Sequence, residues 1–430
     1  MRALIDGSQP RTLRGMMGAS STRPAPLRRE RTEGVTTTVH REALASARAD
    51  PGAGAEARGS GVRIRRVEAI PYSLPYRVPG RFASGVVDRA DNVLVRVHTD
   101  EGVVGQAEAQ PRPYTYGETQ ASILAAVRDW LSPALEGVDV LATELVSERL
   151  EAIAANQVAR SATDLAVWDV VGQVLGVPCS VLLGGYAAGV AAAHMIGFDD
   201  PAAMAEEALA LHERHGVRTF KVKVGRSVEL DLAAVRAMRE ALPDAALYVD
   251  ANRGWSYAQA LRAGDGLIEL GVLAIEEPIS TDDRRGRLRL AERWPVPLVG
   301  DESCISLAHT ARALEEGAVG MVSVKAARTG FTESRRVLAL CLARSTPVVV
   351  GSQYESAIGV QATLAFAAAF AATASNPAEV TNFLDLQDDL LVEPPQVCEG
   401  RVTLRPVPGL GIEVDEAKLA RYRLDRPQGA

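Results

Sequence analysis

Several kinds of residue and segment are scarce in this chain of 430 residues, and each scarcity argues against a class of protein. No run of 18 or more apolar residues is present, so we expect no membrane-spanning helix. Basic charge is not in excess: the formal net charge of −7 argues against a nucleic-acid partner, because phosphate binding needs a basic face. Cysteines are few and lack metal-ligand spacing, so we interpret them as buried free thiols in a reducing, cytoplasmic compartment. They are Cys179, Cys304, Cys341 and Cys398.

The first 61 residues, Met1 to Gly61, lack aromatic residues and sustained hydrophobic periodicity. They are rich in Arg, Ala, Gly, Ser, Thr and Pro, a composition that cannot bury enough apolar surface to fold. The segment also lacks the continuous apolar stretch of a secretory signal. We therefore expect a disordered extension, with ordered sequence beginning at Val62.

Charged residues follow short apolar runs at a nearly constant interval in the middle of the chain. The spacing is 24 to 27 residues, which is the length of one strand and one helix with their loops. A charged group at the end of a core strand is costly unless it is paired or bound to a metal, so the repetition indicates a functional site. The five residues are Lys223, Asp250, Glu276, Asp301 and Lys325.

The segments around these residues indicate a repeating strand and helix pattern. The apolar runs are too short for helices and resemble parallel strands covered on both faces, whereas the segments between them read as amphipathic helices. Further strands are expected at 189–198, in TPVVVGSQ and at 380–386. Eight such strands predict a TIM-type (β/α) barrel with the site at their carboxyl ends. An open doubly wound sheet is the alternative, but it would not gather five successive strand ends around one point.

The sequence before the barrel has a different organisation. Three antiparallel strands, with a turn at Glu101-Gly102, precede three helices that begin near Glu118, Leu141 and Gln157. This order is typical of an α+β capping domain. We expect four parts: a disordered extension over 1–61, the capping domain over 62–184, the barrel over 185–395, and a final segment over 396–430 that returns to the cap.

Three carboxylates are expected to converge at the strand ends: Asp250, Glu276 and Asp301. Because three buried anions repel strongly, they must share protons or be neutralised by a cation. Oxygen ligands suit Mg²⁺ or Mn²⁺, and no nearby His or Cys indicates zinc. The alternative is a ring of salt bridges to Lys or Arg.

Lysines are expected on both sides of these carboxylates. Lys221 and Lys223 lie two residues apart on one strand, so both should point into the barrel mouth. Two neighbouring ammonium groups lower each other's pKa, which can make one of them a base near neutral pH. Lys325 comes from the opposite side, so a substrate would lie between lysines. An ordinary surface pair is the alternative, but the VKV flanks argue for a core strand.

The motifs FKVKVG, VDANRGW, IEEPI, GDES and SVKAARTG resemble those of the enolase superfamily, in particular its muconate lactonizing enzyme subgroup. The helix ATDLAVWDVVGQVLGVPCSVLLGG is also similar, so the resemblance extends from about Val62 to Tyr422. The mandelate racemase subgroup has a histidine where this chain has Lys325. The resemblance implies α/β architecture with a modified (β/α)7β barrel and an α+β cap.

The resemblance also implies roles for the residues at the strand ends. Mg²⁺, or Mn²⁺, would be held by the three carboxylates and would bind the carboxylate of a small-molecule substrate. Lys223 and Lys325 would act as acid and base on opposite faces of the adjacent carbon, and Lys221 would stabilise the enediolate. The supporting residues would be Asn252, Glu302 and Glu355.

Substrate choice in this family depends on two cap loops and the last strands, here YRVPGRFASG, PRPYTYGE and NFLDLQDD. Asp385 starts a sequence, Asp-Leu-Gln, that departs both from the Asp-x-Asp of dipeptide epimerases and from the apolar sequence of muconate lactonizing enzymes. His194, on the first strand, is interpreted as a packed polar residue, with a position facing the site as the alternative. The candidate substrate-binding residues are Arg81, Phe82, Arg112, Tyr114, Tyr116 and Asp385.

Several reactions share this chemistry. Two lysines favour a racemase or epimerase of a small carboxylic acid or amino-acid derivative, and a cycloisomerase or a hydroxy-acid dehydratase is the alternative. A Schiff-base aldolase acting through Lys325 and a non-catalytic binding protein remain as other classes. We expect a homo-oligomer that binds a small carboxylate, with no nucleic-acid or membrane partner.

Overall fold

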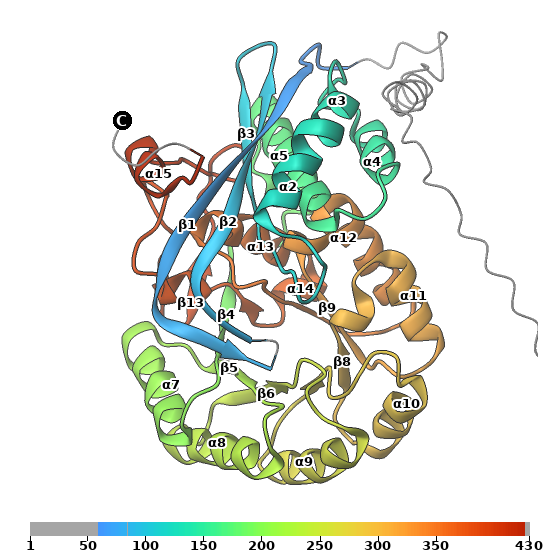
Figure 1. The fold of residues 1–430 in the computed structure, drawn as a ribbon, viewed down its shortest axis with the longest axis vertical. Helices are drawn as coiled ribbons and strands as arrows, with labels where there is room; N and C mark the ends of the chain where they lie inside the picture. The colour runs from blue at the N-terminus through green and yellow to red at the C-terminus, as the bar shows by residue number, and fades with distance from the viewer. Residues whose placement is uncertain (1–58, 84, 426–430) are drawn as a thin grey trace, which may run out of the picture. The chain divides into compact units, whose positions relative to one another are not determined.

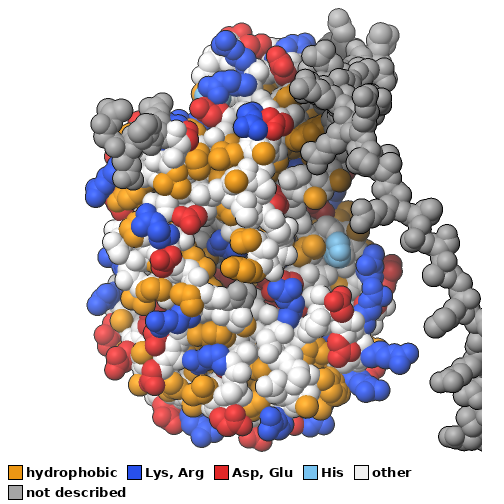
Figure 2. Space-filling view, in the orientation of Figure 1, with side chains coloured by type: hydrophobic (Ala, Val, Ile, Leu, Met, Phe, Trp, Pro, Cys, Tyr) orange, Lys and Arg blue, Asp and Glu red, His pale blue; other side chains and the backbone are white. Residues whose placement is uncertain are grey.

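The computed structural model describes residues 59–83 and 85–425. The disordered extension expected over 1–61 therefore lies, apart from its last three residues, outside the described residues. Acidic and basic side chains are intermixed over the face shown in Figure 2. Among the helices of the described segments, none is both long enough and apolar enough to cross a membrane.

The cap begins with three antiparallel strands in the order β1-β2-β3: β1 (Ile64–Phe82), β2 (Gly85–Thr99) and β3 (Val104–Ala109). Figure 1 shows β1 and β2 as a long hairpin that extends from the cap over the barrel strands. The segment YRVPGRFASG, expected as a loop, is instead the paired end of this hairpin, with Phe82 opposite Gly85. The loop was expected from the family resemblance, although proline, which cannot donate a ladder hydrogen bond, is tolerated at such an edge of a sheet. The pairing skips between Pro75 and Gly80, which accommodates Pro79 without ending the hairpin.

Helices follow the cap strands at the three predicted places. The longest, α5, packs against β3 of the cap and against α12 (Ala326–Ala343) of the barrel, and most of its side chains are buried. The helices of this region are α2 (Gln120–Ala126), the π-helix η1 (Val127–Leu131), α3 (Ser132–Leu135), α4 (Thr143–Glu151), α5 (Gln157–Leu175) and α6 (Cys179–Leu183).

The barrel strands are parallel and neighbours in sequence order, and the last strand pairs with the first. This closed βα arrangement is the predicted TIM-type barrel. Its strands are β4 (Gly189–Ile196), β5 (Thr219–Lys223), β6 (Ala246–Asp250), β7 (Ile275–Glu276), β8 (Leu298–Gly300), β9 (Met321–Val324), β10 (Val348–Val350) and β11 (Ala378–Glu379).

Helices cover the outside of these strands, as Figure 1 shows for α7 to α11. Each long helix starts after one strand and ends before the next. The carboxyl ends of the strands, where the candidate functional residues lie, are therefore all on the same rim of the barrel. The helices are α7 (Pro201–His215), α8 (Val228–Ala241), α9 (Tyr257–Glu269), α10 (Arg284–Arg293), α11 (Leu307–Glu315), α12 (Ala326–Ala343), α13 (Ala357–Ala369) and α14 (Ala371–Ala374), and a short 3₁₀ helix, η2 (Glu302–Cys304), follows β8.

The last barrel strand lies earlier than predicted. We expected it at 380–386, but β11 ends at Glu379, and Asn382–Asp385 forms the 3₁₀ helix η3. The apolar residues Phe383 and Leu386 lie three apart, which matches the period of a 3₁₀ turn rather than the alternation of a strand. Asp385 therefore stands beyond the strand end and not on it.

The final segment contacts both parts of the fold. It contains β12 (Val397–Cys398), β13 (Arg401–Thr403) and α15 (Glu416–Tyr422). Strand β13 pairs with β4 of the barrel, whereas α15 contacts β1 of the cap, where Leu424 N donates to Pro71 O at 2.9 Å. All four cysteines are free, but Cys398 is exposed rather than buried because β12 is an edge strand.

A buried carboxylate links the cap to the barrel. Helix α12 is interrupted at Gly330, whose φ of 65° is outside the helical region. Asp164, on α5, accepts hydrogen bonds from Phe331 N at 2.7 Å and Thr332 N at 3.1 Å, directly after the interruption. A Cβ at position 330 would lie 2.4 Å from Asp164 Oδ2, so glycine is needed there for space as well as for its φ.

Candidate active site

The predicted charged residues lie together at the carboxyl ends of successive strands. Lys223 pairs in register with Asp250, and Asp250 with Glu276, so these three stand side by side on β5, β6 and β7. Asp301 directly follows β8, and Lys325 directly follows β9. Each of these residues is at most 6% exposed, as is Lys221.

The lysines lie directly against the carboxylates. Lys221 Nζ is 2.8 Å from Glu276 Oε1 and 3.1 Å from Asp250 Oδ2. Lys223 Nζ is 2.7 Å from Asp250 Oδ2, and Lys325 Nζ is 2.6 Å from Asp301 Oδ2. The contacts of 2.6, 2.7 and 2.8 Å are charge-assisted hydrogen bonds in a site screened from water.

The expectation that neighbouring lysines lower each other's pKa does not hold for Lys221. Burial alone would lower its pKa, but Glu276, Glu379 and Asp250 outweigh burial and raise the pKa well above the ordinary lysine value. Burial also raises the pKa of Glu276 well above that of an ordinary glutamate. Lys221 therefore only partly balances the negative charge of Glu276 and its neighbouring carboxylates.

The carboxylates have the chemistry of a magnesium site. They offer oxygen donors only, and Glu276 Oε2 is buried without a hydrogen-bond partner. In the described part of the chain, however, the donor oxygens of Asp250, Glu276 and Asp301 do not all lie within 4.8 Å of one another. Lysine ammonium groups stand between them, so the residues fit the ion in type, and binding it would require the lysines to withdraw.

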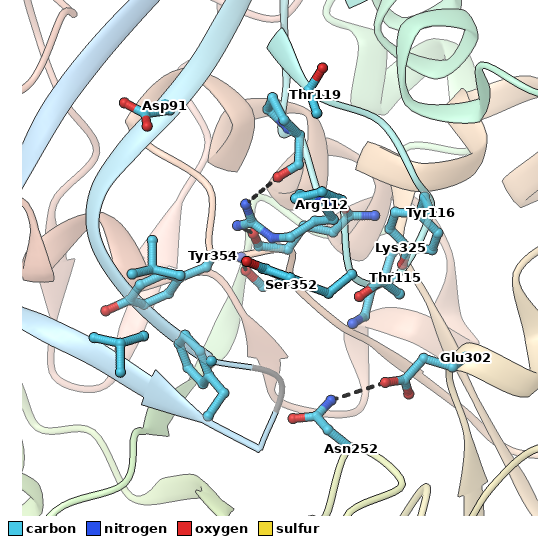
Figure 3. A pocket seen from close by; sticks show the side chains of 18 of the residues that line it. Asp91, Arg112, Thr115, Tyr116, Thr119, Asn252, Glu302, Lys325, Ser352 and Tyr354 are labelled. Carbon is cyan, nitrogen blue, oxygen red and sulfur yellow. Dashed lines mark hydrogen bonds between the residues drawn. The ribbon is translucent and has the colours of Figure 1, made fainter. Parts of the chain in front are cut away.

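The expected supporting residues occupy different positions around this cluster. Asn252 accepts a hydrogen bond from Lys223 Nζ at 2.7 Å. It donates one to Glu302 Oε1 at 3.2 Å, as Figure 3 shows. Burial raises the pKa of Glu302 to about 7. Glu355 accepts hydrogen bonds from Gln353 N at 2.9 Å and from the Ser352 hydroxyl. No lysine of the described residues forms an ion pair with Glu355.

Three charged residues of the cluster were not predicted from the sequence. Glu379 lies 3.1 Å from Lys221 Nζ, Arg328 pairs with Asp301, and Glu277 accepts from Asp301 N at 2.7 Å. Glu379 was missed because the last strand was placed too late. A simple count would have strengthened the prediction: the chain has four lysines, and three of them lie here.

A cavity of about 460 Å³ opens above the cluster and is shown in Figure 3. Lys223, Asp301 and Lys325 line its floor, and the cap lines its opposite side. Four of the candidate substrate-binding residues line this cavity: Phe82, Arg112, Tyr114 and Tyr116. The Phe82 ring centroid lies 5.4 Å from Lys223 Nζ, so the hairpin tip covers one lysine.

The other two candidates, Arg81 and Asp385, line a second cavity of about 730 Å³. Met195 and Tyr354 line both cavities and therefore form the wall between them. Arg81 Nη1 is 3.3 Å from Asp199 Oδ2 on the exposed side of this second cavity. Neither residue lines the first cavity.

His194 lies next to Met195 on β4, and neighbouring residues of a strand point to opposite faces. Met195 faces the cavities, whereas His194 is fully buried on the outer side of β4, with its ring Nδ1 2.9 Å from Thr381 Oγ1. It points away from the lysine and carboxylate cluster.

Comparison with known proteins places two family models on the chain. The model described as the mandelate racemase/muconate lactonizing enzyme N-terminal domain matches residues 65–184, and the enolase C-terminal domain-like model matches residues 203–418. Together they span the cap and the barrel.

Individual relatives cover most of the described chain. A structure of muconate lactonizing enzyme from Mycobacterium smegmatis with muconolactone is 46% identical, with a TM-score of 0.83, and covers 84% of this chain and 100% of the other. Muconate cycloisomerase 1 of Pseudomonas putida is 33% identical over 84% of this chain and 98% of its own. A dipeptide epimerase from Enterococcus faecalis, with Mg and the dipeptide L-Leu-L-Tyr, is 27% identical, with a TM-score of 0.77, over 82% and 99% of the two chains.

Proposed function

Because this chain belongs to the mandelate racemase and muconate lactonizing enzyme family of the enolase superfamily, we propose that it is a cycloisomerase that converts an unsaturated dicarboxylate of the muconate type into a lactone. The observation that carries the proposal is that Lys223 and Lys325 line one cavity from two different strands, with Asp301 between them. The 46% identity to a muconate lactonizing enzyme over its whole length supports the choice of reaction.

Asp250, Glu276 and Asp301 would hold Mg²⁺ once the lysines withdraw from them. The ion would supply positive charge for the substrate carboxylate and for the further negative charge that develops on it during the reaction. Mn²⁺ also prefers oxygen ligands and could replace Mg²⁺ here, because the donors are all oxygen.

One of the lysines would donate the proton that the reaction requires. In lactonisation, one carboxylate oxygen of the substrate adds to a carbon–carbon double bond, and the electron pair moves toward the carbon next to the other carboxylate. That carbon then takes a proton from a lysine Nζ, and solvent restores the proton to the amine. Lys223 and Lys325 both face the cavity, so either Nζ has access, from opposite sides; Lys221, which contacts Glu276 and Asp250, would help to stabilise the charge.

The cap side of the cavity suits a second carboxylate. Arg89 and Arg112 line it. Within the described residues each uses only part of its donor set, because Arg112 donates to two backbone carbonyl groups and Arg89 to Ser73 alone. Asp385, the residue at the position where dipeptide epimerases carry an Asp-x-Asp, lines the other cavity. These positions favour a dicarboxylate over a substrate with a free amino group.

Epimerisation is the second candidate function. Two lysines on one cavity can exchange a proton on each face of a carbon, and this arrangement favoured an epimerase from the sequence alone. The similarity to dipeptide epimerases, such as that of Enterococcus faecalis, supports the same candidate.

The test is turnover in D₂O with Mg²⁺. We expect cis,cis-muconate to lose its conjugated ultraviolet absorption and to yield a lactone with one deuterium on the carbon next to the carboxylate, and EDTA to abolish both. A panel of dipeptides and N-acylated amino acids is incubated in parallel. Deuterium exchange in that panel without lactone formation would replace the cycloisomerase by an epimerase, and no reaction in either set would overturn the proposal.

A further inference from the structure

A second group of potential metal ligands lies on the outer side of β4. His194 on β4, Glu207 on α7 and Asp385 on η3 each offer one donor atom, and these atoms all lie within 4.8 Å of one another. Among the described residues, it is the one group of three or more His, Cys, Asp or Glu residues that meets this distance. We call it the outer cluster.

The hydrogen bonds of His194 fix which ring nitrogen carries the proton. The Thr381 hydroxyl donates to Ala193 O at 3.1 Å, so its oxygen must accept from the other side. His194 Nδ1 is 2.9 Å from this oxygen and therefore carries a hydrogen that it donates. In the neutral ring, the lone pair then lies on Nε2.

That lone pair points at two carboxylates. His194 Nε2 is buried without a hydrogen-bond partner, and it lies 3.5 Å from Asp385 Oδ1 and 4.0 Å from Glu207 Oε1. No lysine or arginine of the described residues forms an ion pair with either carboxylate. Three electron-rich atoms this close together repel unless they share a proton or a cation lies between them.

A proton on His194 would be one such cation, but burial works against it. Burial lowers the pKa of His194 to about 4, so the ring is neutral near pH 7. Burial raises the pKa values of Glu207 and Asp385 to about 7 each, which is the direction expected for carboxylates that lack a positive partner.

We propose that the outer cluster is a second metal site, separate from the strand-end carboxylates, and that it binds a divalent transition-metal ion such as Zn²⁺ through His194 Nε2 and one oxygen each of Glu207 and Asp385. A mixed nitrogen and oxygen donor set suits such ions better than Mg²⁺. Two ligands about 2.1 Å from a tetrahedral ion lie about 3.4 Å apart. This is close to the 3.5 Å between His194 Nε2 and Asp385 Oδ1, whereas Glu207 Oε1, at 4.0 Å, would move toward the ion.

The surroundings of the outer cluster fit this role. A histidine that binds a metal usually donates its other N–H to an oxygen, as His194 does to Thr381. The Glu207 side chain is 44% exposed, so it can move toward an ion, and both carboxylates line the second cavity, which gives access. Asp385 lies close enough to Tyr354, which lines both cavities as part of their shared wall, for the two side chains to interact. An ion here would fix α7, β4 and η3 relative to that wall.

The test measures metal binding and not turnover. The full-length protein is saturated with Mg²⁺ and then titrated with Zn²⁺ by calorimetry, and with Co²⁺ by visible absorption. We expect one further ion per chain, with a Co²⁺ spectrum that indicates nitrogen and oxygen ligands. Glu207→Gln should weaken binding at least about tenfold. Glu206→Gln, which removes the same charge from an exposed neighbour on α7, should bind as the unaltered protein does.

A second pair of variants tests the role of the buried histidine without removing it. Thr381→Val removes the acceptor for Nδ1–H and should weaken Zn²⁺ binding, whereas Thr381→Ser keeps the hydroxyl and should retain it. Absence of a further ion in the Mg²⁺-saturated protein, or equal binding by the Glu207→Gln and Glu206→Gln variants, would overturn the proposal. Neither result depends on the substrate or on the reaction of the first site.

Discussion

The chain holds two groups of carboxylates on opposite sides of one strand, and they differ in how their charge is balanced. Inside the barrel, Asp250 and Asp301 each contact at least one lysine, and Arg328 adds a further positive charge. In the outer cluster, Glu207 and Asp385 face a neutral imidazole.

The difference indicates different kinds of site. We call Asp250, Glu276 and Asp301, together with the lysines that contact them, the inner group. Lysine side chains are long and can leave one carboxylate for a substrate or another partner, so the inner group can redistribute its charge during a reaction. An imidazole on a core strand, held by Thr381, cannot. The inner group therefore suits catalysis, and the outer cluster suits an ion that stays in place.

The largest effect expected from a single change falls on the inner group. Lys223→Ala removes an ammonium group that lines the first cavity, so turnover should fall about 10³-fold while the circular dichroism spectrum is unchanged. Lys418→Ala is the matched control, because Lys418 is a partly exposed lysine paired with Asp388 at 3.3 Å. Near-normal turnover of the Lys223→Ala variant would remove this lysine from the proposed mechanism.

Removal of one inner carboxylate should be the next largest effect. Glu276→Gln deletes a charge from the proposed magnesium ligands, so the Mg²⁺ concentration for half-maximal activity should rise about 10- to 100-fold. The measurement is a Mg²⁺ titration of initial rates after treatment with EDTA. Glu269→Gln, an exposed position at the end of α9, should leave the titration unchanged. An unaltered titration for Glu276→Gln would show that the ion, if required, is held elsewhere.

The two cavities should differ in their effect on substrate binding. Arg112→Ala removes a guanidinium from the first cavity and should raise KM about tenfold, the equivalent of one charged hydrogen bond. Arg81→Ala changes only the second cavity and should keep KM within about twofold. Steady-state kinetics with one dicarboxylate gives KM for both variants. Equal increases in KM would mean that the wall at Tyr354 does not separate the cavities in solution.

The smallest expected effect concerns stability. An ion at 100 times its dissociation constant stabilises the folded state by about 2.7 kcal/mol, so saturating Zn²⁺ should raise the Tm by about 3 °C. Differential scanning calorimetry of the Mg²⁺-saturated protein measures the shift. Glu207→Gln should lose it and Glu206→Gln should keep it. A shift of the same size in both variants would assign the ion to another position.

The sequence predicted the inner group well because a βα repeat has a nearly constant length. Lys223, Asp250 and Lys325 could be placed on one rim from their spacing alone, since every strand of a barrel ends on the same side. The scarcity of lysine elsewhere in the chain supports the same placement.

The sequence could not predict features that depend on tertiary pairing. The family resemblance implied a loop at YRVPGRFASG, but pairing with β2 kept the segment extended to Phe82. Asp385 was placed on a strand by extending the βα repeat forward, but Asn382–Asp385 forms a 3₁₀ helix and Asp385 lines the second cavity. The raised pKa of Lys221 depends on three carboxylates brought close by folding.

The link between Asp164 and the interruption of α12 bears on how such enzymes can be recombined. The short stretch that carries Lys325 and Arg328 ends at Gly330, and the backbone that follows is held by a carboxylate of the cap helix α5. A chimaera that joins this cap to the barrel of a relative would keep the Asp164 carboxylate of one parent. It would take the backbone after the interruption of α12 from the other parent, so the two need not match. The transferable unit is therefore α5 together with β9 and the start of α12, and crossover points between relatives are best placed outside it.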